Sequence, residues 1–406
     1  MSVEQIDLLS REFIDDPYPY LDELRAKPVA WNDKLKGWVI SGHDEVLEAL
    51  QRTASMSSDR VGNYVRYRAS GSGVPDGSSS REILSRWLAF NDPPSHTRLR
   101  RLVAAALTPR AVSGLAGRVE EICRDLVDGL RERDVPEFDV ISDYSYPLPV
   151  TIISELLGIP GADHARIRDW SAAAMLVVFM ALETDSRHEQ AEIALSELAE
   201  YLRFIVDQRR EQPEDDLISA LVRAEAEHDA LTTEEIIATI TLLLFGGHET
   251  TSNLIANGML ALLQNPAELR RLRADPDLMP SAVEEFLRYD GPIRGFMRWV
   301  RQDAVIGNVT LRPGERAFVV VDGANRDPRV FNAPDVLDIS RTPNRHVEFG
   351  YGIHHCLGAP LARIEAPIAF RTLLDGFPRL ALKDERPEWA RALLSRNMRR
   401  LQVQVG

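Results

Sequence analysis

The sequence predicts a mainly helical protein with a small β region. The clearest support is residues 232–264, which have the length and the apolar character of one long buried helix. Amphipathic or strongly apolar segments of helical length recur on its N-terminal side, whereas the β-like runs are short and lie toward the two ends of the chain. The length of 406 residues suits two or three average domains or one large enzyme domain.

Composition narrows the class of protein. The formal net charge of −14 makes anionic nucleic acid an unfavourable partner. Two cysteines cannot form a disulfide framework, and they fit a reducing compartment. Residues 1–19 are acidic without an apolar core of signal-peptide length, and no apolar run approaches the ~18 residues of a membrane span. We therefore expect a soluble cytoplasmic protein with neither a nucleic-acid nor a membrane partner.

The N-terminal half is predicted to contain one hairpin and a series of helices. Two short apolar runs around a turn-prone segment predict the hairpin, and apolar residues at helical spacing predict the helices. In order, the hairpin covers residues 29–40 and the helices cover 44–50, 96–102, 119–130, 141–159 and 170–182. Cys123 lies among apolar residues of the fourth of these elements, so we expect it in the core.

The long helix contains an abrupt change of character. Thr232 and Glu235 form a capping-box pattern that starts the helix, which at 1.5 Å per residue extends ~45 Å. Its apolar middle, residues 236–245, gives way to Gly246-Gly247-His248-Glu249-Thr250-Thr251. A mid-helix glycine costs ~1 kcal/mol against alanine, and a buried glutamate costs more unless it is bonded. Such a breach in a core helix indicates a functional site or, alternatively, a kinked crossing of helices.

The C-terminal part combines an ion-pair pattern with short strands. Glu285 and Arg288 stand three positions apart on a predicted helix, where they can pair. Two β-like runs follow, then a coil rich in Asn, Asp, Arg and Pro, and finally a strand that we expect at a sheet edge. These segments cover residues 306–311, 317–321, 324–344 and 401–405.

The segment Phe349-Gly350-Tyr351-Gly352-Ile353-His354-His355-Cys356-Leu357-Gly358 places one of the two cysteines at the start of a predicted helix, residues 357–374. Pro360 falls in the first turn, where its missing N–H costs nothing, and Pro367 should kink the helix. The free N–H groups and the positive end of the helix favour a thiolate at Cys356. The glycines allow tight turns and let the backbone approach a flat ligand closely.

Three interpretations of Cys356 compete. A lone cysteine is commonly a small core residue. His354, His355 and Cys356 could bind zinc, but neighbouring residues in one turn rarely close a tetrahedron, and no second Cys or His cluster accompanies them. The third interpretation is an axial ligand to iron. The pattern decides for it, because the segment resembles the haem-thiolate loop of the cytochromes P450, F-G-x-G-x-H-x-C-x-G, with every fixed position present.

The resemblance to soluble bacterial cytochromes P450 covers essentially the whole chain, from Asp16-Pro17-Tyr18 to the C-terminal strand. It implies one catalytic domain, residues 1–406, with the family fold: a triangular prism of helices around haem b, whose iron binds the Cys356 thiolate. The positions that match haem-contacting residues of the family are His96, Arg100, Gly246, Arg298, Phe349, Gly350, His354, Cys356 and Gly358. Of these, His96, Arg100, Arg298 and His354 match residues that bond the propionates.

Two further motifs resemble those of the family. Glu249 and Thr250 match the acid–alcohol pair of the oxygen-binding groove, where they would carry protons toward bound O₂. Gly246 replaces the usual alanine there, a change that widens the groove. Glu285 and Arg288 match the E-x-x-R pair. Arg341 is the expected third member, which locks the coil before the cysteine loop.

By this resemblance the protein is a monooxygenase that inserts one atom of O₂ into an organic substrate, most simply by hydroxylation. NAD(P)H would supply electrons through a separate ferredoxin and ferredoxin reductase, because the chain contains no flavin or iron–sulfur module. The alternatives are a peroxide-driven peroxygenase and a non-catalytic haem-binding sensor, and the intact Glu249–Thr250 pair argues against both. We expect a monomer. Arg98 and Arg101, which point away from the His96–Arg100 face, are predicted to dock an acidic ferredoxin.

Family position also predicts the substrate pocket. The residues expected around the cavity are Val178, Phe245, Ile293, Phe296 and Met398. Because these are apolar, the substrate should be mainly apolar. Nearby arginines suggest one polar handle on it: Arg294 in the segment over the haem, and Arg66 and Arg68 beside Tyr64. The Ser/Gly-rich residues 70–80 that follow could be a lid or an ordinary surface loop.

Overall fold

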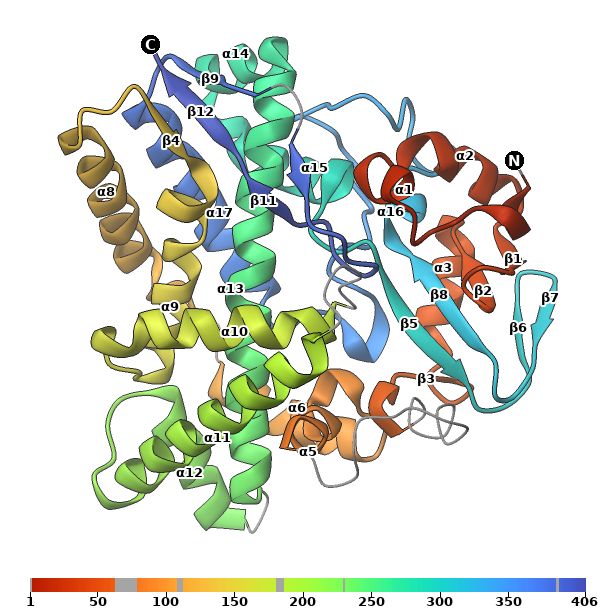
Figure 1. The fold of residues 1–406 in the computed structure, drawn as a ribbon, viewed down its shortest axis with the longest axis horizontal. Helices are drawn as coiled ribbons and strands as arrows, with labels where there is room; N and C mark the ends of the chain where they lie inside the picture. The colour runs from red at the N-terminus through yellow and green to blue at the C-terminus, as the bar shows by residue number, and fades with distance from the viewer. Residues whose placement is uncertain (1, 63–78, 108–111, 180–185, 229–230, 385–386) are drawn as a thin grey trace.

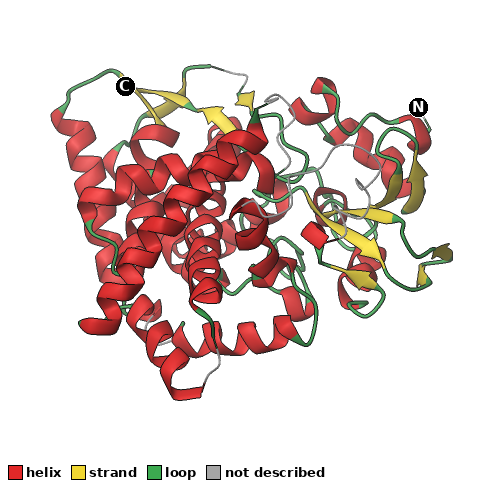
Figure 2. Ribbon diagram, turned by 60° about the horizontal axis from the view of Figure 1, so that its bottom comes forward, coloured by secondary structure: helices red, strands yellow, loops and turns green. Residues whose placement is uncertain are grey.

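Helices make up most of the molecule, and the strands lie in two groups at its margin, one near each terminus (Figure 1, Figure 2). The computed structural model describes residues 2–62, 79–107, 112–179, 186–228, 231–384 and 387–406. The chain is 59% helical with a small sheet region, so the predicted fold class is confirmed. Of the helices in these ranges, none is long and apolar enough to cross a membrane.

The long helix α13, Thr233–Gln264, runs through the middle of the helical part (Figure 1). The predicted capping box is present. The Thr232 hydroxyl accepts from the Glu235 N–H at 3.2 Å, and the Glu235 carboxylate accepts from the Thr232 N–H at 3.0 Å. The backbone stays helical through Gly246 and Gly247. The predicted change at Gly246–Thr251 is therefore a change from apolar to small and polar side chains, and the helix continues through it.

Other helices pack along the whole of α13. Those with the most extensive contact are α5 (Ser79–Arg86), α9 (Pro147–Leu157), α11 (Arg187–Glu211), α15 (Met279–Asp290) and α17 (Ala359–Gly376). The N-terminal half of α13 shares an apolar cluster with α5, α9 and α11, and its C-terminal half shares another with α15 and α17. The Gly246–Thr251 segment lies where the two clusters meet.

The remaining helices complete the molecule. They are α1 (Arg11–Asp15), α2 (Tyr18–Ala26), α3 (His43–Gln51), α6 (Ser95–Ala106), α8 (Ala116–Glu132), α10 (His164–Val178), α12 (Leu217–His228), α14 (Pro266–Ala274) and α16 (Val321–Asn325). Single turns of 3₁₀-helix are η1 (Val3–Gln5), η2 (Leu88–Phe90), η4 (Gly161–Asp163), η5 (Pro276–Leu278) and η6 (Gly352–His354), and η3 (Ile141–Ser145) is π-helical. The predicted helices at 44–50, 96–102 and 119–130 are α3, α6 and α8. Cys123 is fully buried on α8, as predicted.

A five-stranded sheet lies beside the N-terminal helices (Figure 1). Its strands in spatial order are β1 (Val29–Asn32), β2 (Gly37–Ile40), β8 (Arg316–Val320), β5 (Gly295–Val300) and β3 (Met56–Ser57). β1 and β2 form the predicted hairpin, with Val29 opposite Ile40. β5 pairs antiparallel with β8, and this pairing fixes the segment that forms one wall of the site described below.

Two predicted strands differ from the structure. The run predicted over residues 306–311 is a hairpin of β6 (Ala304–Ile306) and β7 (Val309–Leu311), because Gly307 adopts a positive φ of 55° and reverses the chain. The final strand, β12 (Gln402–Val405), is not at an edge. It lies between β4 (Glu137–Asp139) and β9 (Leu380–Leu382), where both of its sides find backbone partners. The two remaining strands, β10 (Glu388–Trp389) and β11 (Met398–Arg400), pair with each other.

Candidate active site

The loop that precedes α17 is a tight turn that presents Cys356 to a cavity. Gly350 and Gly352 have φ values of 71° and 67°, in the left-handed region that disfavours side chains. The Cys356 N–H donates to the Phe349 carbonyl at 2.8 Å and closes the turn. Two residues after Gly358, Pro360 lies in the first turn of α17, and the helix continues through Pro367 to Gly376.

Cys356 lines the cavity and is exposed to it. Burial raises the pKa of its thiol above the ordinary value. The N–H groups of Gly358 and Ala359 at the start of α17 and the guanidinium groups of Arg100 and Arg363 act in the opposite direction and favour the thiolate. The predicted effect of the helix end is therefore present, but it is smaller than the effect of burial.

The cavity has a volume of about 320 Å³ and separates the cysteine loop from the middle of α13. Cys356 and Gly358 line one wall, and Gly246 and Gly247 line the facing one. A Cβ atom on Gly246 would meet nothing within 4 Å, so the glycine leaves open space at this point of the groove. Gly350 also lines the cavity, whereas the Phe349 ring packs below the Arg363 guanidinium at 4.5 Å. The glycines leave these parts of the lining without side chains, so a flat group can approach the backbone closely there.

Four basic side chains converge at one end of the cavity. The rings of His96 and His354 lie 4.3 Å apart between centroids, and Arg298 and Arg100 line the cavity beside His354. His96 is 1% exposed, and both of its ring nitrogens are buried without a hydrogen-bond partner. Burial, aided by the neighbouring cations, lowers the pKa of His354 to about 3 and also lowers that of His96. Among the described residues His96 has no hydrogen-bond partner, whereas His354 lies 3.0 Å from the Ser58 hydroxyl and Arg100 donates to the His355 carbonyl. The two carboxylates of a haem are anions that this basic cluster would bind.

Glu249 and Thr250 lie one turn beyond the glycines on α13, outside the residues that line the cavity. The Thr250 hydroxyl donates to the Gly246 carbonyl at 2.7 Å, which keeps it on the helix face that carries Gly246. The Glu249 side chain is 13% exposed. Burial raises the pKa of its carboxyl to about 7, a change that the Asn253 amide partly opposes. A carboxyl with this pKa both gives and takes a proton at neutral pH.

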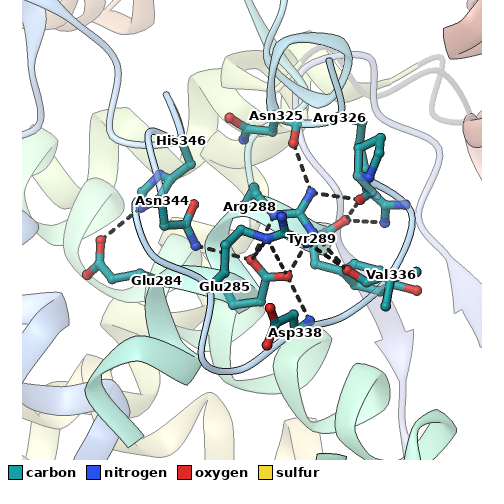
Figure 3. Close-up of polar contacts among 12 residues, drawn as sticks. Glu284, Glu285, Arg288, Tyr289, Asn325, Arg326, Val336, Asp338, Asn344 and His346 are labelled. Atoms are coloured by element: carbon teal, nitrogen blue, oxygen red, sulfur yellow. Dashed lines mark hydrogen bonds and ion pairs between the residues drawn. The ribbon is translucent and has the colours of Figure 1, made fainter. Parts of the chain in front are cut away.

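The predicted three-residue lock is present, and Figure 3 shows its Glu285–Arg288 pair with the polar contacts around it. Glu285 and Arg288 are fully buried and form two hydrogen bonds with each other, at 2.7 and 2.8 Å. Arg341 Nε donates to the same carboxylate at 3.1 Å, and the Asn344 amide donates to it at 3.1 Å. Arg288 also donates to the carbonyl groups of Asn325, Pro334 and Val336. The network ties α15 to the coil that leads into the cysteine loop.

Three of the five predicted pocket residues line the cavity, namely Val178, Ile293 and Phe296. Phe245 does not, because it lies off the stripe of α13 that faces the cavity and packs against Trp87 at 5.4 Å between ring centroids. Met398 does not either: it is 5% exposed and lies in the apolar cluster around the C-terminal half of α13. Neither residue is among those that line this cavity, so a contact of either with the substrate stays a prediction.

Arg294 also differs from the prediction. It is 2% exposed and turns away from the cavity toward the N-terminal segment, where it donates to the carbonyl groups of Phe13 and Ile14 and pairs with Asp322 at 3.4 Å. These partners satisfy its charge, so it cannot serve as a substrate handle. Residues 64, 66, 68 and most of the predicted lid, 70–80, lie outside the described residues.

Arg98 is likewise engaged within the molecule. It forms an ion pair with Glu235 in the first turn of α13, so its charge is not free for an acidic partner. Arg101 is exposed on the same helix, α6. The predicted docking pair is therefore reduced to Arg101.

Among the cavity residues that the sequence analysis missed, Arg60 is the charged one. Arg60 lines the cavity and donates to the carbonyl groups of Val177, at 2.8 Å, and Val178 at the end of α10, with its guanidinium 5.5 Å from the centre of the Phe90 ring. It brings a positive charge into an otherwise mainly apolar part of the cavity. Its sequence neighbourhood, just ahead of the predicted lid, was the available signal.

Comparison with known proteins agrees with this geometry. The family model for cytochrome P450 matches residues 70–403. The chain is 39% identical to cytochrome P450 CYP107DY1 of Priestia megaterium over 86% of this chain and 85% of that protein. Its fold is similar to that of P450BioI in complex with an acyl carrier protein ligated to hexadec-9Z-enoic acid, with a TM-score of 0.88, 33% identity and coverage of 97% and 99%. It is also similar to the myxobacterial cytochrome P450 CYP267B1 in complex with myristic acid, with a TM-score of 0.88, 36% identity and coverage of 98% of each chain. A haem-thiolate centre accounts for the cysteine loop, the glycine wall and the basic cluster together, and the chain belongs to the cytochrome P450 family of monooxygenases.

Proposed function

We propose that this enzyme hydroxylates a mainly apolar organic acid, with haem bound through the Cys356 thiolate and electrons delivered by a separate ferredoxin and its NAD(P)H-dependent reductase. The observation that carries the proposal is the cavity itself. Cys356 faces Gly246 and Gly247 across it, and the acid–alcohol pair lies one turn further along α13. When bound, the haem supplies activation of O₂, which a thiolate ligand favours by donating electron density to iron.

The protein's own residues have three tasks in this mechanism. The basic cluster of His96, Arg100, Arg298 and His354 holds the two propionates by charge-assisted hydrogen bonds. The Thr250 hydroxyl, which donates to the Gly246 carbonyl one turn from the glycine wall, would hold a proton or a water at Oγ1. The Glu249 carboxyl, with a pKa near 7, returns protons to it. The same enclosure would limit the access of bulk water to the reacting atoms.

The Cys356 ligand is tested by replacement with histidine. Cys356→His keeps a residue that can bind iron but removes the thiolate, so the reduced carbon monoxide complex should lose its long-wavelength Soret band. The haem content of the same preparation, measured by absorbance without substrate, shows whether the variant still binds haem. A band that survives in Cys356→His would assign the ligand elsewhere.

Arg60 supports an acidic group on the substrate. A guanidinium in an apolar cavity needs acceptors, and here it uses two backbone carbonyls at the end of α10, where a carboxylate would bind more strongly. The two complexes named above contain fatty-acid groups, although P450BioI presents its acyl chain on a carrier protein. Arg60 takes the place that the sequence suggested for Arg294.

The substrate class is tested with matched ligands. Fatty acids of ten to sixteen carbons and their methyl esters are titrated while the spin state of the haem is followed in the Soret region. We expect the acids to bind at least tenfold more tightly than the esters in the wild type, and Arg60→Met to remove this difference. Arg101→Met on the exposed side of α6 is the control and should leave both affinities unchanged. Equal affinities of acids and esters in the wild type would refute the acidic handle.

The source of electrons and oxygen is tested separately. Turnover with a ferredoxin–reductase pair, NAD(P)H and O₂ should exceed turnover with hydrogen peroxide alone, because the intact Glu249–Thr250 pair serves reduction of O₂. Faster turnover with peroxide alone would make the enzyme a peroxygenase.

A further inference from the structure

A series of polar side chains leads from the buried Glu249 carboxyl toward the surface, and the mechanism above does not use it. Glu249 Oε1 lies 3.8 Å from Nε2 of His248. The same imidazole nitrogen lies 3.1 Å from the hydroxyl of Tyr146, which caps the start of α9. That hydroxyl is 3.5 Å from the carbonyl oxygen of Arg168, a residue of α10 whose side chain is exposed. The three side chains thus span the distance from the helix core to the outer layer.

The hydrogen-bond direction along this series is fixed by His248. Its Nδ1 lies 2.6 Å from the Leu244 carbonyl, and because a carbonyl only accepts, Nδ1 carries the ring hydrogen. Burial lowers the pKa of His248 to about 4, so the ring is neutral at pH 7 and Nε2 has a free lone pair. The Tyr146 hydroxyl therefore donates to Nε2. The two rings are also held edge-to-face, with centroids 5.2 Å apart, so their relative orientation is constrained.

Burial and the neighbouring charges set the protonation states of Tyr146 and Glu249, the two ends of the series. Burial is the main cause of the raised pKa of Tyr146, with Glu249 and Asp169 adding to the rise and Arg168 opposing it, so the phenol stays protonated. Glu249 changes its protonation near pH 7, with the Asn253 amide as its polar neighbour on α13. At rest, a protonated phenol thus lies at the outer end of the series, and an acid that loses and regains a proton lies at the inner end.

We propose that Tyr146 and His248 conduct protons from solvent to Glu249, an inference that rests on the proposed function. The Tyr146 proton moves to Nε2 of His248, a solvent proton replaces it on the phenol oxygen, and the Nε2 proton moves to Oε1 of Glu249. One proton leaves solvent, one O–H bond forms on Glu249, and both relay residues return to their starting state. For the last transfer the Glu249 side chain must move about 1 Å closer to His248, within the freedom of one side-chain torsion. Both relay residues act through Glu249 and do not contact the substrate.

The contrasting explanation is that the pair only bridges α9 and α13. Tyr146→Phe separates the two, because it keeps the ring contact with His248 and removes only the hydroxyl. The oxidised, substrate-free holoprotein is subjected to a pH jump from about 8 to about 6. The protonation of Glu249 is monitored through its carboxyl band in time-resolved infrared spectra. The absence of that band in Glu249→Gln identifies it. This readout needs neither electrons nor substrate.

We expect Tyr146→Phe to slow proton uptake by Glu249 at least tenfold. Tyr201→Phe is the matched control: Tyr201 is a half-buried phenol on α11 that donates to Asp163 at 2.9 Å and has no contact with the series, so the rate should be unchanged. A bridging role alone would lower the melting temperature of Tyr146→Phe and leave the rate as in the wild type, which would overturn the proposal. A slowing of equal size in Tyr201→Phe would overturn it too.

A second measurement is made during turnover with a ferredoxin–reductase pair. Tyr146→Phe should form several-fold less product for each NAD(P)H consumed and show a larger solvent isotope effect, with an unchanged substrate dissociation constant. Wild-type coupling and isotope effect in this variant would contradict the proton path. If Glu249→Gln itself turns over with full coupling, the proposed role of the acid fails, and the pH-jump rates still decide whether the path exists.

Discussion

The buried network around Glu285 should contribute more to stability than any exposed ion pair of the molecule. In Arg288→Met, Glu285 loses two hydrogen bonds, and the carbonyl groups of Asn325, Pro334 and Val336 lose their donors. Leaving one partner of a buried pair uncompensated costs about 3–5 kcal/mol. Arg341 still lies beside Glu285 and offsets part of this, so we expect a loss of about 4 kcal/mol, the middle of that range.

Two further variants are expected to lose less unfolding free energy than Arg288→Met. Arg341→Gln leaves the Glu285–Arg288 pair intact and removes one charge-assisted contact, so it should cost about 1.5–3 kcal/mol. Arg118→Ala is the matched surface control. Arg118 bonds two carboxylates, those of Glu155 and Glu121, but its side chain is 44% exposed, and exposed pairs contribute about 0–1 kcal/mol.

The assay is urea unfolding of the ferric holoprotein, followed by circular dichroism and by haem absorbance. Coincidence of the two curves shows that a single free energy can be assigned. The expected order of destabilisation is Arg288→Met, then Arg341→Gln, then Arg118→Ala. Equal losses at Arg288 and Arg118, with full haem content in both variants, would show that the network is not needed to hold the coil and the cysteine loop.

Two other predictions concern α13. Thr250→Ala should keep substrate binding and NAD(P)H consumption but release more of the electrons as hydrogen peroxide, because it removes the hydroxyl of the groove; unchanged product per NAD(P)H would exclude the proton-holding role. Glu249 has a pKa raised from 4.5 to about 7, so its neutral form stabilises the fold below pH 4.5 and this contribution is lost as pH rises through 7. The unfolding free energy of the wild type, relative to Glu249→Gln, should therefore fall by up to about 3 kcal/mol from pH 4.5 to 8 in paired urea titrations. A relative gain over that range would mean that the charged form is the favoured one.

The parts of the fold that follow from local chemistry could be predicted from the sequence. The capping box at Thr232 and Glu235 needs only residues three apart, and it starts α13 where expected. The hairpin at residues 29–40 is similarly local. The place of β12 between β4 and β9 depends on strands far apart along the chain, and nothing in its own residues distinguishes a central from an edge strand.

The same division applies to the site. The cysteine loop was recognised because its glycines and cysteine lie within ten residues of one another. The pocket was predicted less well, since whether a side chain faces the cavity depends on its angle on the helix or on distant acceptors. Phe245 lies beside cavity-facing residues but packs against Trp87, and Arg294 turns toward carbonyls nearly three hundred residues away. Arg60 lines the cavity and bonds the end of α10, and its position just ahead of the predicted lid was the one local signal for this role.

Burial has opposite effects on the acids and bases around the cavity, and these effects explain why one ligand suits all of them. It raises the pKa of the Cys356 thiol and lowers those of His96 and His354, so each group is held neutral unless an opposite charge lies against it. A metal cation at the sulfur stabilises the thiolate, and carboxylates at the imidazoles stabilise their protonated forms. Cys356 would hold the metal of such a group, and the His96–His354 pair would hold its carboxylates. A chain that buries these residues together therefore favours a metal porphyrin with its carboxylates on one edge over a free metal ion, which would satisfy the thiolate and leave the histidine pair without an anion.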